Sequence, residues 1–332
     1  MRRFDGLEIS VPLSDLMLKT LINANESYAE LNTIVRLYPL TEAIKNALWI
    51  NELYYQKENT NSENNINNIL LDTFYPNQTI SNNADIMRCC MIYAKQQISE
   101  ASVLTAADIL KINSVFSNNN AEILKINTTM TFPFAQIEYL WEILHFLYLP
   151  DKKMPFIFDA AMAFCKIITL PFDTKIDMRT LIILFSFVFQ KEYIFWGISK
   201  QWKILIDPRL KLSEYSPDEA VVKILSVFEN TWRDSCELIY KIKTAANEIP
   251  VILQDKLPQL CSHNIMSLLK NNICLKNSGV QEKLGISNKT VISYLKSLEE
   301  NSIISSKKFG KSKLYFNEIL CEVLRKHIVN MF

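Results

Sequence analysis

Apolar residues recur at spacings of three and four along most of this chain, and that spacing is the period of an amphipathic α-helix. The helices that it predicts cover residues 14–37, 41–58, 84–98, 105–117, 135–149, 155–169, 179–195 and 217–248. Thr105 is expected to cap one of them, with Asp108 at its third helical position. Strand patterns are almost absent before residue 300, so a mainly α protein is predicted.

The C-terminal part of the chain has a different pattern. Two short helices are predicted at 264–272 and 278–287, the second ending at Gly285, and a third helix follows with Ser287 as its N-cap. The apolar stripe of this third helix consists of Val291, Leu295 and Leu298. Residues 303–316 then have the pattern of a strand, a Gly turn and a second strand. This order of elements is that of a winged helix-turn-helix domain.

Charge is unevenly distributed along the chain. Residues 276–326 hold ten Lys and Arg against five Asp and Glu, a net charge of +5, whereas the rest of the chain holds 26 against 30, a net charge of −4. Basic residues concentrated on a winged helix favour contacts with DNA phosphates. The residues predicted to contact DNA are Ser287, Asn288, Lys289, Ser293 and Lys296 on the third helix and Lys307, Lys308, Lys311 and Lys313 on the hairpin. The alternative interpretation is a protein-interaction or dimerisation module, on which these lysines form a solvated surface.

Composition excludes several classes of site. The five Gly are widely dispersed, so the chain has neither a P-loop nor a dinucleotide-binding fingerprint. The seven Cys form no CxxC pair and are interpreted as reduced thiols of a cytoplasmic protein. His145, His263 and His327 are isolated in the sequence, so no metal site is expected.

Two features argue against a membrane protein. The first fifteen residues are basic but lack an apolar core, so no signal peptide is expected. The most apolar run, 181–189, has nine residues, whereas a membrane-spanning helix needs about 20. We therefore expect a cytoplasmic protein with no membrane partner.

A polar loop separates the apolar helices predicted at 155–169 and 179–195. Its sequence LPFDTKIDMRTL, residues 170–181, resembles the signature HPFxxGNGRxxR of the Fic (filamentation induced by cAMP) family. The sequence YYQKENT, residues 54–60, resembles the inhibitory element of that family, and many bacterial members carry a winged helix after the Fic core. The resemblance implies a Fic-type helical core followed by a small winged helix-turn-helix domain.

In the Fic family this loop transfers AMP from ATP to a target hydroxyl, with Mg²⁺ bridging the phosphates. The resemblance places Leu170 where the family has its general base, a His, and Leu170 cannot accept a proton. Pro171 and Phe172 match the family's Pro-Phe pair. Thr174 falls at the position of the acidic Mg²⁺ ligand, and Asp173 is its neighbour.

The remaining loop positions also depart from the family. Lys175, Ile176 and Asp177 replace the Gly-Asn-Gly phosphate cradle, and their β-carbons prevent a close approach of the backbone to a phosphate. In the family the Arg residues of this loop neutralise the charge of the phosphates. Arg179 lies one residue away from the first Arg position and could serve if the loop is shifted by one residue. The degenerate inhibitory element contains Tyr54, Glu58 and Asn59, with Tyr54 in place of the usual Ser or Thr.

Loss of a general base alone costs roughly 10²–10⁴ in rate, so the loop is interpreted as the remains of a catalytic site. No catalytic residue and no cofactor are expected. ATP and Mg²⁺ would be required only if AMP transfer is retained. Two alternatives stay open, which are AMP transfer by an altered mechanism and an ordinary interhelical loop.

The resemblance divides the chain into four segments. These are an N-terminal helical region at 1–80, a Fic-like core at 81–200, a helical extension and linker at 201–255, and the winged helix-turn-helix domain at 256–332. The predicted function is that of an inactive Fic-like protein, a pseudoenzyme, that acts as a DNA-binding or signalling regulator. The alternatives are a divergent active nucleotidyltransferase and a protein-interaction scaffold. The partners considered are DNA, another protein and a second copy of the chain, because one winged module buries little surface on DNA.

Overall fold

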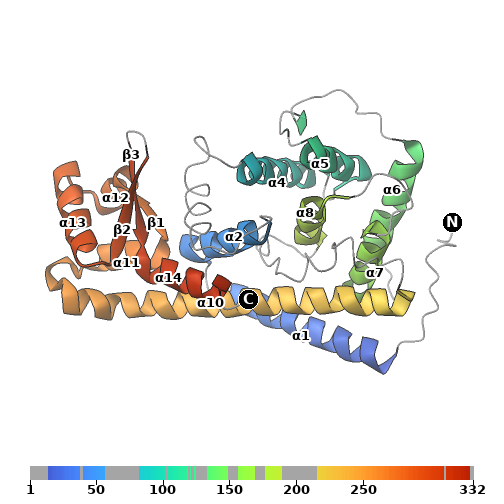
Figure 1. Cartoon of the computed structure of the whole chain (residues 1–332), viewed down its shortest axis with the longest axis horizontal. Helices are drawn as coiled ribbons and strands as arrows, with labels where there is room; N and C mark the ends of the chain where they lie inside the picture. The colour runs from blue at the N-terminus through green and yellow to red at the C-terminus, as the bar shows by residue number, and fades with distance from the viewer. Residues whose placement is uncertain are drawn as a thin grey trace. The chain divides into compact units, whose positions relative to one another are not determined.

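The computed structural model describes residues 14–37, 40–56, 82–101, 104–118, 120, 123–124, 133–148, 156–168, 176–188, 215–309 and 312–329. In these residues α-helices predominate and the strands form a small antiparallel sheet, which confirms the predicted mainly α class (Figure 1). The helices before the C-terminal domain are α1 Asp15–Leu37, α2 Glu42–Gln56, α4 Asn82–Ala101, α5 Ala106–Asn118, α6 Phe134–Tyr148, α7 Phe156–Ile168, α8 Met178–Val188 and α10 Pro217–Lys256. The elements that follow are η3 Pro258–Leu260, α11 His263–Asn271, β1 Cys274–Lys276, α12 Asn277–Leu284, α13 Asn288–Glu300, β2 Ile304–Phe309, β3 Ser312–Asn317 and α14 Glu318–Val329.

Helix α10 continues beyond the end predicted from the sequence. The apolar period predicts a helix that ends at residue 248, whereas the structure extends it to Lys256 through Pro250. A proline inside a helix costs about 3 kcal/mol because it removes a backbone hydrogen bond. Ile249 and Leu253 are fully buried on either side of Pro250, and their burial offsets that cost.

Contacts divide the chain into two compact units. The first contains residues up to Asn32 together with Tyr75–Asp234, and the second contains Thr33–Phe74 together with Ser235–Phe332. Two of the boundaries fall inside helices, in α1 and in α10. Nothing in the order of the chain indicates that residues 33–74 group with its C-terminal part.

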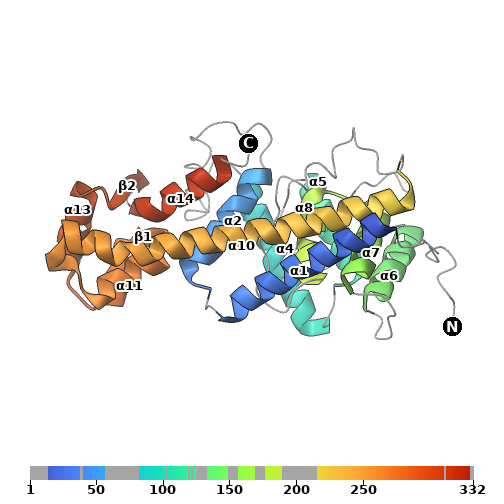
Figure 2. The same ribbon diagram turned by 90° about the horizontal axis from the view of Figure 1, so that it is seen from below.

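The core of the first unit is a cluster of aromatic side chains. Phe164 on α7 meets Phe185 on α8 and Phe228 on α10 edge to face, with ring centroids 5.9 and 5.6 Å apart. Tyr28 on α1 lies 4.9 Å from the ring of Trp232, which is also on α10. Figures 1 and 2 both show α1 beside the first half of α10. Edge-to-face rings contribute beyond their buried area, so this cluster holds four helices of the unit together.

The start of α5 is fixed as the sequence predicts. The Thr105 backbone N–H donates to Asp108 Oδ2 at 2.9 Å, and the Asp108 N–H donates to Thr105 Oγ1 at 3.2 Å. This reciprocal pair is a capping box, with Asp in the usual place of Glu. Tyr93 on α4 also donates its hydroxyl to Asp108 Oδ1 at 2.8 Å, so the cap joins α4 to α5.

The second unit contains the winged helix, in which α11, α12 and α13 lie beside the three-stranded sheet (Figure 1). The strand order is β1-β3-β2, and both pairs are antiparallel. The hairpin of β2 and β3 forms the predicted wing, whereas β1 was not expected from the sequence. Three residues carry too little pattern to indicate a strand, and β1 exists because Leu275 pairs with Tyr315 on β3.

Helix α14 completes this unit and was also absent from the predicted elements. Asn317 starts it, since its side-chain oxygen accepts from the Leu320 N–H at 3.4 Å while its amide donates to the Leu269 carbonyl at 2.9 Å. The Asn317 N–H donates to the Ile273 carbonyl at 2.8 Å. One buried Asn therefore ties β3, α11 and α14 together.

Candidate functional site

The start of helix α13 is defined by two residues that precede it. Gly285 ends α12 with φ 64°, a left-handed conformation that favours glycine. Ser287 has the extended backbone of an N-cap, and its hydroxyl accepts from the Thr290 N–H at 3.2 Å. The sequence therefore determines where this helix begins, as predicted.

Burial gives α13 an inner face and an outer face. Val291, Leu295 and Leu298 are at most 2% exposed, as expected for the apolar stripe. The outer-face residues predicted to contact DNA are all exposed in the structure, and they are Asn288, Lys289, Ser293 and Lys296. The Lys296 side chain is 73% exposed, although its ammonium lies 3.6 Å from Glu300. The outer face thus presents amide, hydroxyl and ammonium groups to solvent.

The predicted wing lysines differ in their surroundings. Lys307 and Lys308 on β2 are exposed, and Lys311 lies outside the described residues. Lys313 on β3 donates to Glu299 at 3.0 Å and lies 4.9 Å from the centroid of the Tyr315 ring. Lys313 is therefore held against the end of α13, and Lys307 and Lys308 are exposed on β2.

Glu299 fastens the wing to α13, and sequence reasoning missed this role. Its carboxylate accepts from the Ser306 hydroxyl on β2 and from Lys313 on β3. The hydrogen bond from Ser306 has the larger effect and the one from Lys313 the smaller. Both lower the pKa of Glu299 below its ordinary value of 4.5. A Glu in the last turn of a helix opposite a hairpin Lys is the one signal in the sequence for this contact.

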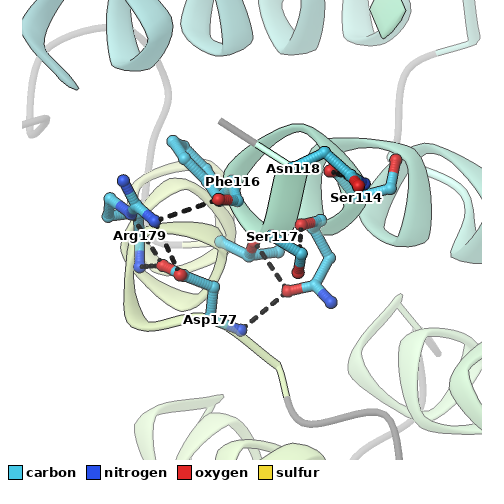
Figure 3. Close-up of polar contacts among 8 residues, drawn as sticks. Ser114, Phe116, Ser117, Asn118, Asp177 and Arg179 are labelled. Atoms are coloured by element: carbon cyan, nitrogen blue, oxygen red, sulfur yellow. Dashed lines mark hydrogen bonds and ion pairs between the residues drawn. The ribbon is translucent and has the colours of Figure 1, made fainter. Parts of the chain in front are cut away.

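The loop whose sequence resembles the Fic signature is described from Ile176 onward, and the predicted site residues Leu170, Pro171, Phe172, Asp173, Thr174 and Lys175 lie outside the described residues. Asp177 precedes α8 and caps it, since its carboxylate accepts from the Arg179 N–H at 2.8 Å. The Arg179 guanidinium folds back onto the same carboxylate through two bonds, at 2.9 Å to Oδ1 and 2.8 Å to Oδ2 (Figure 3). The two charged residues of this segment are thus paired with each other.

Contacts with α5 fix this pair in place. Arg179 donates to the Phe116 carbonyl at 3.3 Å, and its guanidinium lies 4.5 Å from the centroid of the Phe116 ring (Figure 3). The side-chain oxygen of Asn113 accepts from the Asp177 N–H at 2.7 Å and from the Thr180 hydroxyl at 3.2 Å. The geometry is that of a helix start anchored on a neighbouring helix.

Asp177 and Arg179 do not fit a bound nucleotide. A phosphate would have to take the Arg179 guanidinium away from both oxygens of Asp177, whose negative charge would then face that phosphate. Of the residues that resemble the Fic inhibitory element, Glu58 and Asn59 lie outside the described residues, as does the side chain of Tyr54. Helix α2 contains Tyr54 in its last turn.

Burial keeps at least three of the seven cysteines protonated. All seven are free thiols. Burial raises the pKa of Cys90, Cys165 and Cys274 to about 12, so these sulfurs are protonated at neutral pH. Among the described residues no group of three His, Cys, Asp or Glu side chains could hold a metal ion.

No helix in the described part of the chain is both long enough and apolar enough to cross a membrane. A comparison with models of known protein families finds no match for this chain, and a comparison with curated proteins finds no relative.

Proposed function

We propose that this chain is a DNA-binding regulator whose winged helix binds duplex DNA, and whose helical body is a Fic-like scaffold that does not transfer AMP. The observation that carries the DNA-binding proposal is the outer face of α13. Asn288, Lys289, Ser293 and Lys296 are all exposed there, on the helix that a helix-turn-helix domain inserts into the major groove.

The wing supplies the second surface for DNA. Lys307 and Lys308 are exposed on β2, on the strand that directly follows α13. Lysine side chains on a wing can meet phosphates, while the amide and ammonium groups of Asn288 and Lys289 can reach base edges. Phosphate contacts give affinity for any duplex, and base contacts discriminate between sequences.

Salt-dependent binding of the full chain to duplex DNA tests this proposal. We expect binding of a random-sequence duplex at about 50 mM salt, with an affinity that falls linearly when both affinity and salt are on logarithmic scales. Absence of duplex binding at that salt concentration would reject the proposal and leave the protein-interaction scaffold as the better interpretation.

A specific observation favours that scaffold as the second candidate function. Lys313 and Lys296 are paired with Glu299 and Glu300, so part of the basic charge of this domain is already balanced within the chain. A winged helix with a balanced surface suits a protein partner better than a phosphate backbone.

The proposal that the body does not transfer AMP rests on the paired loop residues. Arg179 would be the nearest candidate for neutralising the charge of a phosphate. Its guanidinium already donates two hydrogen bonds to the carboxylate of Asp177. Incubation of the purified chain with labelled ATP and either Mg²⁺ or Mn²⁺ tests this, and incorporation of adenylate above a heat-inactivated control would reject it.

A further inference from the structure

An apolar side chain lies among the exposed polar residues of α13. Ile292 is 46% exposed and lies outside the buried stripe of that helix. Asn288 lies one turn before it and Lys296 one turn after it, and both are exposed. Residues four apart in a helix share one face, so these three side chains form a single row.

This row has a spacing that suits nearby base pairs. A helix rises about 1.5 Å per residue, so Asn288 and Ile292 are separated by about 6 Å along the axis. Base pairs are stacked about 3.4 Å apart along the DNA axis, so side chains about 6 Å apart reach base pairs that are at most about two steps apart. A recognition helix directs its N-terminal residues at base edges, and Asn288 and Ile292 belong to the first two turns of α13.

The two side chains have distinct partners among the bases. An asparagine amide can bond adenine at N6 and N7, and an apolar side chain can pack against the 5-methyl group of thymine. An isoleucine pressed against a G·C pair would instead cover donors and acceptors without bonding them, which disfavours that pair. The charged and polar side chains beside Ile292 would not by themselves detect the methyl group of thymine.

We propose that Ile292 contacts the 5-methyl group of a thymine, within about two base pairs of an adenine that Asn288 bonds, and so restricts the binding site to A·T pairs at these positions. This inference rests on the proposed DNA-binding function. It adds a specificity-determining residue that charge and polarity do not reveal.

Replacement of thymine by uracil isolates the methyl group. The full chain is first used to select its preferred duplex from a random library, and each thymine of that duplex is then replaced singly by deoxyuridine. Burial of one methyl group contributes a factor of about four to a binding constant. We expect one uracil substitution to weaken wild-type binding by about fourfold, and the variant Ile292→Ala to bind the thymine and uracil duplexes equally.

The control variant is Val251→Ala, which truncates another exposed apolar side chain of the same unit, 70% exposed on α10. It should keep the wild-type response to uracil. A selected duplex without any uracil-sensitive thymine, or a uracil effect that persists in Ile292→Ala, would overturn the inference and leave DNA binding intact. Failure to bind any duplex would overturn both this inference and the proposed function.

Discussion

Burial sets the protonation state of His327 on α14. Its side chain is 1% exposed, and its Nδ1 lies 3.4 Å from the ammonium of Lys241 on α10. Lys241 is in turn paired with Glu237. The Nε2 of His327 has no hydrogen-bond partner among the described residues. Burial, followed by the charge of Lys241, lowers the pKa of His327 from 6.5 to about 4, so the imidazole is neutral in the folded protein.

Acid should therefore destabilise the folded chain through His327. Between pH 6.5 and about 4 the unfolded chain binds a proton that the folded chain does not, so stability falls as the pH falls through this window. The loss is on the order of 3 kcal/mol at the lower end. Thermal unfolding at several pH values should show a shallower acid dependence for His327→Leu than for the wild type. The exposed Val251 on α10 offers the control, because Val251→Ala removes no titratable group and should keep the wild-type dependence. Equal dependences for all three proteins would contradict a depressed pKa.

A single substitution in the loop that resembles the Fic signature should not produce AMP transfer. Leu170→His supplies a general base, which is worth roughly 10²–10⁴ in rate when the rest of the site is present. By the resemblance, Lys175 and Asp177 stand where the Fic signature has its Gly-Asn-Gly phosphate cradle. Arg179 is bonded to Asp177 in the structure. We expect no labelled adenylate above background for this variant. Incorporation by Leu170→His would show that the loop can still hold a nucleotide.

At the scale of elements, the wing and α13 act together through Glu299. Its bonds to Ser306 and Lys313 hold the hairpin against the C-terminal end of the helix. Such an exposed ion pair adds less than about 1 kcal/mol to stability, so its effect is on orientation. The exposed lysines of the wing then have a defined direction relative to the outer face of α13.

The salt dependence of DNA binding should depend on the lysines of the wing. Replacement of Lys308 and Lys311 by Ala removes two positive charges from the hairpin. We expect weaker binding by a similar factor for all duplex sequences, with the slope of log affinity against log salt reduced by about 0.9 for each phosphate that the variant no longer neutralises. Filter binding over a range of salt concentrations measures this slope. Lys19→Ala on α1 is the matched control and should leave it unchanged, and a sequence-dependent decrease in affinity would instead indicate base contacts by the wing.

At the scale of the whole molecule, the aromatic cluster should dominate the stability of the first unit. Phe164 is fully buried and meets both Phe185 and Phe228. Phe164→Ala should cost about 3–5 kcal/mol in the free energy of unfolding. The exposed Phe134, which begins α6 in the same unit, provides the control, and Phe134→Ala should cost less than about 1 kcal/mol. Denaturant titration compares the two variants, and similar losses for both would mean that the cluster is not the core of the unit.

Local patterns in the sequence account for much of this fold. The apolar period places the helices, because each helix buries one face and the spacing of that face is regular. The capping box of Thr105 and Asp108 and the N-cap Ser287 are also predictable, since each joins residues only three positions apart. The exposed outer face of α13 follows from the burial of its apolar stripe. The Fic resemblance and the DNA contacts stay predictions.

The tertiary structure decided the features that depend on distant partners. Strand β1 and helix α14 have little local signal, and they form because β1 pairs with β3 and α14 packs against α2, β2 and β3. Arg179 was considered as a phosphate ligand from the sequence, whereas its contact with Phe116 depends on a residue 63 positions away. Glu299 likewise depends on Lys313 across the wing. A sequence pattern predicts the contacts of a residue with neighbours that are a few positions away. The contacts of that residue with a distant charged group or aromatic ring are decided only in the folded chain, because burial and pairing depend on the three-dimensional surroundings of the side chain.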